Sequence, residues 1–269
     1  MEDVPMKKTL RTLFAVLALT LCLCLPAFAQ DAKPAQPAAK EDKVVMEPSD
    51  FEYFMQDSVG FTTNFGGPYN FAPADHKSPI QTYGDALAEG AVAMLRLMTS
   101  SEEVDDTLLN TSGHAFLAVT NVSQQDINVG GLLIAPGTSV TIGTRGNRNE
   151  HAGIWYNLES YYRYYLPDSY YVNIYSIQVS LDQSQLDTLN RNLAAADHWS
   201  AIYNCAAFAV SMWNSVCSDP LSSGGIYTPT ALRNDLLARY ADKAVFRPTV
   251  PYDYIVYYGR DLTPSKEFS

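Results

Sequence analysis

The stretch Tyr203-Asn-Cys-Ala-Ala-Phe-Ala-Val-Ser-Met-Trp-Asn214 carries the strongest local signal in the chain. Asn204 is a favoured helix cap, and the apolar residues after it recur at helical spacing. The pattern predicts a helix from Cys205 that buries Phe208, Ala209, Met212, Trp213 and Val216. Cys205 therefore lies at the open end of the buried stripe, where a packed helix holds its thiol while one side stays reachable.

The position of Cys205 favours a chemically active thiol. Helix N-termini carry partial positive charge and N–H groups that stabilise a thiolate or an oxyanion. The competing interpretation is a buried and inert cysteine, the commonest fate of a helical cysteine. Cys217 follows on the same predicted helix, about 18 Å of rise away, so the two thiols cannot form a disulfide. We expect Cys217 to be structural or exposed, with no chemical role.

A thiol nucleophile is usually activated by an imidazole on a rigid element, and His114 is the best placed of the four histidines. It opens an apolar run over 115–119 that predicts a central strand. His151 starts another strand-like segment and is the preferred third catalytic residue. His76 is expected to be solvated in a loop, and His198 to lie at the end of a helix.

Two segments resemble a known family. Ser112-Gly-His-Ala-Phe-Leu-Ala-Val119 is similar to the histidine strand of circularly permuted NlpC/P60-type (papain-like) proteins, a group that includes the lecithin:retinol acyltransferase relatives. Residues 203–214 resemble the Asn-Cys helix of the same group. In permuted members the histidine strand precedes the cysteine helix, as it does here. The resemblance covers about residues 111–240. It implies an α+β fold with an antiparallel sheet packed against the cysteine-bearing helix, a Cys–His pair and a third polar residue.

The identity of that third residue is open. In the family it usually lies on the strand after the histidine strand. Here about thirty residues, Asn121 to Glu150, separate His114 from the next candidates. His151, Asn157 and Glu159 could each orient the imidazole, and His151 is preferred.

Periodicity and capping residues predict the remaining elements. Helices are expected over 85–98, from Ser100 to about 110, after Asp182 and after Thr228. Strands are expected over 127–134, 139–144, 154–158, 171–181 and, in one or two pieces, 245–258. The tyrosine-rich run over 156–175 is interpreted as an extended, half-buried segment, with a platform for a glycan or peptide as the alternative.

The N-terminus indicates export. Lys7, Lys8 and Arg11 precede an apolar run over 13–25, and Ala27-Phe-Ala29 is typical of a signal peptidase site. We expect a signal peptide over 1–29, cleaved after Ala29, and a disordered linker over 30–45. An irregular or helical extension is expected over 46–110, and the permuted papain-like domain over 111–269. The apolar run is too short for a good membrane span, so none is expected after cleavage.

Charge and missing motifs exclude several classes of protein. The net charge of −11 opposes binding to nucleic acid. The cysteines and histidines lack the compact spacing of a zinc site, and no G-x-S-x-G serine motif occurs. No cofactor is expected. The sequence thus predicts an exported thiol hydrolase that cleaves an amide in a peptide or peptidoglycan-like substrate. The alternatives are an acyltransferase acting on a lipid or ester, and a binding module that keeps the fold without catalysis.

Overall fold

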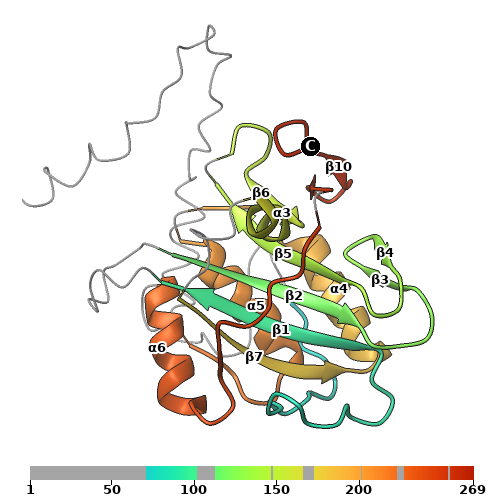
Figure 1. The fold of residues 1–269 in the computed structure, drawn as a ribbon, viewed down its shortest axis with the longest axis vertical. Coiled ribbons are helices and arrows are strands. Elements are labelled where there is room, and N and C mark those ends of the chain that lie inside the picture. The colour runs from blue at the N-terminus through green and yellow to red at the C-terminus, as the bar shows by residue number, and fades with distance from the viewer. Residues whose placement is uncertain are drawn as a thin grey trace, which may run out of the picture. The chain divides into compact units, whose positions relative to one another are not determined.

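The computed structural model describes residues 71–101, 113–146, 148–165, 173–200, 202–222, 227–253 and 255–269. The predicted signal peptide over 1–29, the linker over 30–45, the first part of the predicted extension and most of the helix expected over 100–110 lie outside the described residues. The described part is a mixed α+β structure built on an antiparallel sheet, as predicted at that level (Figure 1).

The main sheet contains eight strands in the order β10-β9-β6-β5-β2-β1-β7-β8, and every pairing in it is antiparallel. Its strands are β1 (Ala93–Ser100), β2 (His114–Asn121), β5 (Ser139–Arg145), β6 (Gly153–Tyr156), β7 (Ile174–Leu181), β8 (Val245–Phe246), β9 (Tyr257–Tyr258) and β10 (Thr263–Pro264). A separate hairpin of β3 (Ile127–Val129) and β4 (Leu132–Ile134) replaces the single strand expected over 127–134. Gly130 and Gly131, both at positive φ, form its turn.

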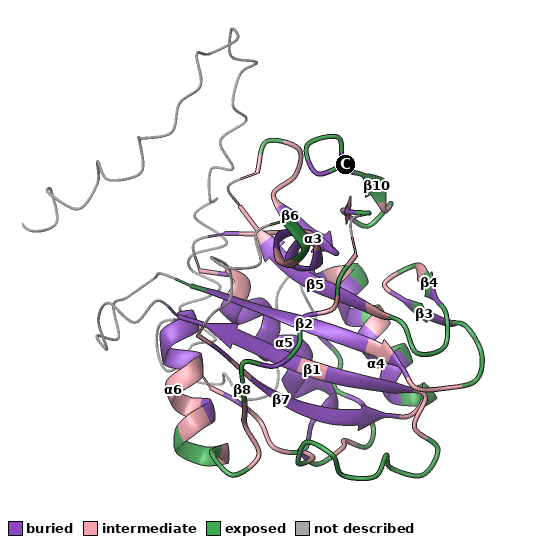
Figure 2. Ribbon diagram, in the orientation of Figure 1, coloured by how far each residue is buried: buried purple, intermediate pink, exposed green. Residues whose placement is uncertain are grey.

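The strand that begins at His114 is central, as its sequence predicts. Leu117 is paired with Leu97 of β1 on one side and with Ile142 of β5 on the other. The first six side chains of β2 are all buried, which explains the apolar character of both of its faces. Figure 2 shows the same continuous burial along the middle strands.

The helix predicted over 85–98 is wrong, because residues 93–100 form β1 at the centre of the sheet. Its two neighbours are β2 and β7, and both of its faces are covered. Leu95 and Leu97 pack in the main core, whereas Met98 packs in a cluster on the opposite face. Burial on both faces removes the period-two alternation that distinguishes a strand from a helix in sequence.

Residues on both sides of the boundary predicted at residue 111 meet in one sheet. Strand β1 belongs to the predicted N-terminal extension, yet it is hydrogen-bonded along its length to β2 and β7. Residues 71–101 therefore form part of the same folded unit as the histidine strand and the cysteine helix.

Helices cover the two faces of the sheet unequally. Three of these helices are α4 (Gln183–Ala195), α5 (Cys205–Val216) and α6 (Pro229–Tyr240). Their N-caps are Asp182, Asn204 and Thr228, as predicted from sequence. They pack in the main core with Val140 and Ile142 of β5. Thr141, which lies between these two residues and points to the other face, contacts Ser160 of α3 (Leu158–Tyr165). Helix α3 therefore lies on the face opposite α5 (Figure 1).

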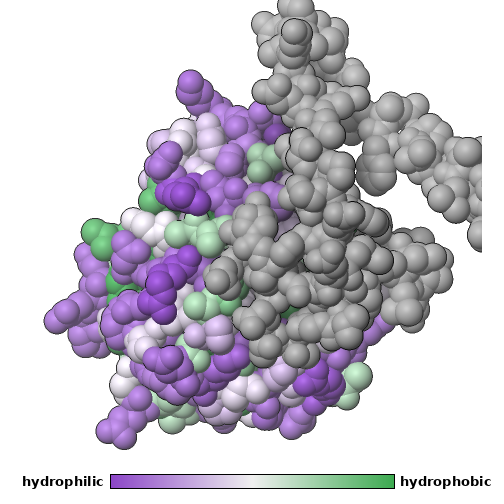
Figure 3. All heavy atoms as spheres, turned by 180° about the vertical axis from the view of Figure 1, so that it is seen from behind, coloured by the Kyte–Doolittle hydropathy of each residue, from purple (hydrophilic) through white to green (hydrophobic). Residues whose placement is uncertain are grey.

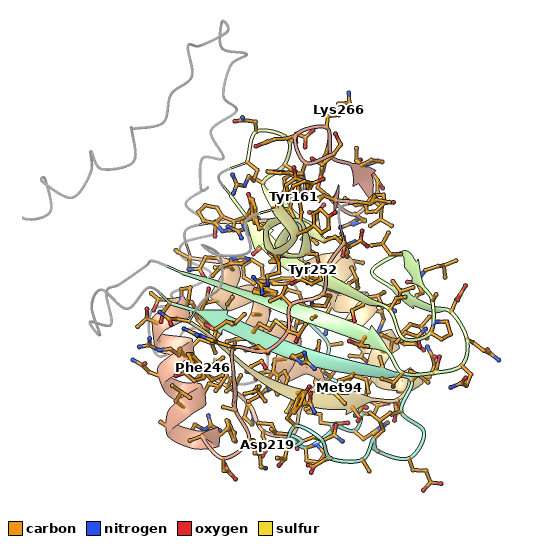
Figure 4. The ribbon with its side chains drawn as sticks, in the orientation of Figure 1. Met94, Tyr161, Asp219, Phe246, Tyr252 and Lys266 are labelled. Atoms are coloured by element: carbon orange, nitrogen blue, oxygen red, sulfur yellow. The ribbon has the colours of Figure 1, made fainter. Side chains whose placement is uncertain are left out.

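The presence of α3 corrects the extended conformation expected for the tyrosine-rich run. Strand β6 ends at Tyr156, and the chain enters α3 two residues later. Leu158 and Tyr162 are buried against Trp155 and Phe268, while Tyr164 and Tyr165 are exposed. Figure 4 shows Tyr161 on this helix, with Lys266 of the C-terminal segment beyond it. The high strand propensity of tyrosine is overridden here by burial of one helical face.

The surface is consistent with the acidic, polar composition. On the side seen in Figure 3, hydrophilic residues predominate in the part of the surface that the structure describes. Among the described residues, no helix combines the length and the apolar character needed to cross a membrane.

Candidate thiol active site

The cysteine helix is fixed at its first residue, where the site is built. Asn204 adopts extended backbone angles, and its side-chain oxygen accepts from the amides of Ala206 at 3.0 Å and Ala207 at 3.2 Å. The Asn204 amide group also donates to the carbonyl of Tyr227 at 2.7 Å, which ties the cap to the segment before α6. The thiol of Cys205 thus starts from a rigid position at the helix N-terminus.

Both cysteines of the described chain are free thiols, as predicted, but their surroundings differ. Cys205 is partly exposed, whereas Cys217 is fully buried. Burial raises the pKa of Cys217 to about 12, which keeps that thiol protonated and unreactive at neutral pH.

His114 is the imidazole that meets the Cys205 thiol. The ring of His114 is hydrogen-bonded to Cys205, and the backbone amide of Ala115 donates to the sulfur. His114 itself is 5% exposed and stacks on Phe116 with ring centres 5.6 Å apart. The structure therefore brings together the two residues that the sequence selected, although 91 positions separate them in the chain.

Glu159 is the third member of the site. Its Oε1 lies 2.7 Å from His114 Nε2, and the carboxylate is completely buried in the first turn of α3. The contact fixes the tautomer and orientation of the ring, as an acidic partner does in other nucleophile–histidine sites.

The preference for His151 as that third residue is therefore corrected. His151 Nε2 lies 2.6 Å from Asp197 Oδ1, and its ring stacks on Tyr258. Asp197 is further held by the amides of Ile154 at 3.0 Å and Arg260 at 2.9 Å. This second histidine–carboxylate pair joins β6, the residues before α5 and the C-terminal segment, and it is not the pair that orients His114.

The other candidate residues also have partners elsewhere. Asn157, at a positive φ of 63°, accepts from the Thr141 amide at 3.3 Å and donates to Asp253 at 3.0 Å, so it fixes the turn into α3. His76 contacts Asp182 at the exposed N-terminus of α4. His198 stacks on the ring of Tyr203.

Gly143 makes the His114–Glu159 contact possible. It lies on β5, on the face that packs against α3. A Cβ atom at this position would lie 3.1 Å from His114 Nε2 and 2.4 Å from Glu159 Oε1. Only glycine leaves room there for both side chains. A glycine inside a strand pattern marks such close approaches, and it is the sequence signal that could have indicated this part of the site.

The charges around the thiol favour the ionised form of Cys205. Burial alone would raise its pKa, but the hydrogen bond and charge of His114, the Ala115 amide and the charge of Arg145 together lower the pKa below the ordinary value. The same opposing effects act on the carboxyl of Glu159. Burial raises its pKa, but the hydrogen bond and charge of His114 and the charge of Arg145 lower it by more, so the net pKa is lowered and the group is an anion.

No protein-family model, curated protein or solved structure matches the chain. The arrangement is thus interpreted from its own chemistry. Among the described residues, no group of three or more histidine, cysteine or acidic side chains is arranged to hold a metal ion. The site contains a thiol with a lowered pKa, an imidazole next to it and a buried carboxylate next to the imidazole. Such a set is suited to nucleophilic attack with proton transfer.

Proposed function

We propose that this chain is an exported thiol hydrolase of the permuted papain-like type, acting on an amide bond in a peptide or cell-wall peptide. The observation that carries the proposal is the continuous chain of contacts from the Cys205 thiol through His114 to the buried Glu159. Buried carboxylates are rare unless they are paired, and this one is paired with the ring that meets the thiol.

In the proposed reaction, the Cys205 thiolate attacks the carbonyl carbon of the amide and forms a tetrahedral oxyanion. His114, protonated in the resting ion pair, gives its proton to the leaving amine as the C–N bond breaks and a thioester forms. Neutral His114 then takes a proton from water as the water oxygen attacks the thioester. Collapse of the resulting intermediate breaks the C–S bond and releases the acid product, which leaves the Cys205 thiolate beside protonated His114 as at the start. Glu159 holds the ring in place throughout and stabilises it whenever it carries the proton.

The oxyanion needs hydrogen-bond donors, and the helix N-terminus provides a limited choice. The amides of Ala206 and Ala207 are already occupied by the Asn204 side chain. We therefore assign the role to the backbone amide of Cys205 itself, which lies next to the attacking sulfur. The sequence led us to expect several first-turn amides as oxyanion donors, whereas this assignment uses one.

Three features support the permuted papain-like assignment. The sheet is antiparallel, its central strand begins with the histidine, and the cysteine helix packs beneath that strand. The histidine also precedes the cysteine in the chain, as the permuted order requires. An amide substrate outside the cytoplasm is proposed from the sequence resemblance and the predicted signal peptide.

The test is the reactivity of the thiol toward iodoacetamide, measured site by site by mass spectrometry of peptides containing Cys205 or Cys217. At pH 6, we expect Cys205 to be alkylated much faster than Cys217, because an ordinary thiol with a pKa of about 8.5 is less than about 1% ionised there. His114→Ala should slow the Cys205 reaction by roughly 10- to 100-fold at pH 6, since a charged hydrogen bond contributes about 1.5–3 kcal/mol.

Cys217→Ser provides the matched control, and it should leave the reaction of Cys205 unchanged. Equal and slow labelling of both cysteines would overturn the proposal and favour a non-catalytic binding module. Transfer of an acyl group to an added amine or alcohol in preference to water would instead favour the acyltransferase alternative.

A further inference from the structure

The first turn of α3 carries Glu159, so the contacts that hold this turn bear on the thiol site. Glu159 is the second residue of the helix and is completely buried. Asn157 lies two residues before it, at a φ of 63°, in the left-handed region that asparagine tolerates better than most residues. Such a conformation persists only where the surroundings fix it. The placement of Glu159 therefore depends on the contacts that hold Asn157.

Strand β5 holds the chain on both sides of Glu159 through one residue, Thr141. The Asn157 backbone amide donates to the Thr141 carbonyl at 2.9 Å, and the Thr141 amide donates to Asn157 Oδ1 at 3.3 Å. Thr141 Oγ1 accepts from the Ser160 amide at 3.3 Å and lies 3.2 Å from the Ser160 hydroxyl. Thr141 is two positions before Gly143 and on the same face of β5. One face of β5 thus anchors α3 and also leaves room for the His114–Glu159 contact.

A turn from the C-terminal part of the chain holds the other side of Asn157. Asn157 Nδ2 donates to Asp253 Oδ2 at 3.0 Å and to the carbonyl of Ile255 at 3.1 Å. The second carboxylate oxygen, Asp253 Oδ1, accepts from the Ile255 amide at 3.0 Å. Asp253 therefore accepts one hydrogen bond of the Asn157 side chain and fixes the residue that accepts the other.

The neighbours of Asp253 in the chain also pack along α3. The ring centre of Tyr252 lies 6.4 Å from that of Tyr164, near the end of the helix (Figure 4). Val256 is buried in the same apolar cluster as Leu158, the first residue of the helix. Contacts on both sides of Asp253 therefore hold its carboxylate against the helix that carries the catalytic acid.

We propose that Asp253 is a positioning residue of the thiol site, which holds Asn157 and the first turn of α3 so that Glu159 meets His114. The inference rests on the proposed thiol chemistry and adds to it a residue that acts only through others. Catalytic groups need such support, because a small displacement of the residue that orients the imidazole weakens the whole set. Loss of Asp253 should therefore disturb the ionisation of Cys205 and leave the thiol itself in place.

The experiment measures the rate of alkylation of Cys205 by iodoacetamide across a range of pH. His114 from β2, Arg145 from β5 and Glu159 from α3 all stay in the Asp253→Ala variant. We expect this variant to react roughly three- to tenfold more slowly than wild type at pH 6, less than the loss expected for a direct partner of the ring. At high pH, where the thiol is ionised in both proteins, the rates should agree within about twofold.

The direction of the change separates positioning from a direct effect of charge. Removal of an anion near the thiol would by itself favour the thiolate, lower the pKa of Cys205 and speed the reaction at pH 6. A displaced Glu159 would instead raise that pKa and slow the reaction. A faster reaction in Asp253→Ala would therefore overturn the proposal.

Asn157→Gly tests the route from Asp253 to the helix. Glycine keeps the left-handed backbone without strain and removes the side-chain amide, so this variant should show a loss similar to that of Asp253→Ala. The double variant should be no slower than the slower single variant, because both changes break one link. Multiplication of the two losses would overturn the route through Asn157. Cys217, which is fully buried, must stay unlabelled in every variant, since its alkylation reports unfolding. If Asp253→Ala unfolds by this criterion, the Asn157→Gly profile decides.

Asp219→Ala is the matched control. Asp219 is also partly buried, and its Oδ2 accepts from the backbone amide of Ile80 at 3.2 Å. It lies beside Cys217, at the opposite end of α5 from Cys205. This variant should lose stability in a urea titration while the pH profile of Cys205 changes by less than about twofold at any pH. A loss as large as that of Asp253→Ala would show that the effect is not local and would overturn the proposal.

Failure of this inference is distinguishable from failure of the proposed function. If wild-type Cys205 reacts quickly and His114→Ala slows that reaction, the thiol chemistry stands. Profiles of Asp253→Ala and Asn157→Gly that match wild type would then overturn the positioning role alone. Slow and equal labelling of Cys205 and Cys217 in the wild type would overturn both proposals.

Discussion

Gly143→Ala is the sharpest test of the site geometry, because it adds one methyl group between the two residues that orient the thiol. The added Cβ would lie 2.4 Å from Glu159 Oε1 and 3.1 Å from His114 Nε2. Ordinary contact between such atoms is about 3.4 Å, so the carboxylate oxygen must retreat by about 1 Å. The His114–Glu159 contact, now 2.7 Å, is then broken or strained.

The expected magnitude follows from what that contact does. A hydrogen bond to a charged group contributes about 1.5–3 kcal/mol, and each 1.36 kcal/mol corresponds to a factor of ten. We therefore expect Gly143→Ala to slow the alkylation of Cys205 by iodoacetamide at pH 6 by roughly 10- to 100-fold. Overpacking should also cost about 1–3 kcal/mol of unfolding free energy, measured by urea titration.

The neighbouring strand offers a matched control with the same steric problem. A Cβ at Gly153 would lie 2.4 Å from both Asp197 Oδ1 and His151 Nε2, so Gly153→Ala disturbs the second histidine–carboxylate pair. It should destabilise the fold by a similar amount while the thiol rate changes by less than about threefold. If Gly153→Ala slowed the thiol as much as Gly143→Ala, the reasoning that separates the two pairs would be refuted.

Two further predictions concern the carboxylate and the helix cap. Because the pKa of Glu159 is lowered in the folded state, its charge stabilises the protein above the unfolded value of about 4.3 and that contribution is lost as pH falls through the lower folded value. The stability of the wild type relative to Glu159→Gln should therefore fall between pH 6 and pH 3, as measured by thermal unfolding of both proteins at each pH. Asn204→Ala should cost about 1 kcal/mol of stability and also slow Cys205, because the cap positions the first turn of α5. Asp182→Ala, which removes the cap of α4, should cost a similar amount in a urea titration and leave the thiol rate unchanged.

The elements with strong local signals could be predicted from sequence. The caps of α4, α5 and α6 are local hydrogen bonds between a side chain and the next turn, so the residues that make them are adjacent in the chain. The Cys205–His114 pair could be predicted from sequence for a related reason. Each residue lies at the start of an element whose apolar pattern is distinctive, and a resemblance joined the two.

The remaining features depend on contacts that are remote in sequence. Met94, Leu95 and Met98 fit a helical stripe, and only the pairing of β1 with two neighbours shows that they point to opposite faces. The contact of His114 with Glu159, and not with His151, also depends on residues that are remote in sequence. It depends on α3 packing against β5 beside Gly143, and the tyrosine-rich sequence gives little sign of a helix.

The order of the sheet bears on how the protein avoids self-association. Strand β8 borders β7 at one margin, and β9 and β10 extend the opposite margin beyond β6, so residues 245–264 complete both margins. Until that segment has paired, the backbone groups of β6 and β7 stay open to pairing with other chains. A molecule in which residues 245–264 are detached is therefore more prone to self-association than the fully paired one.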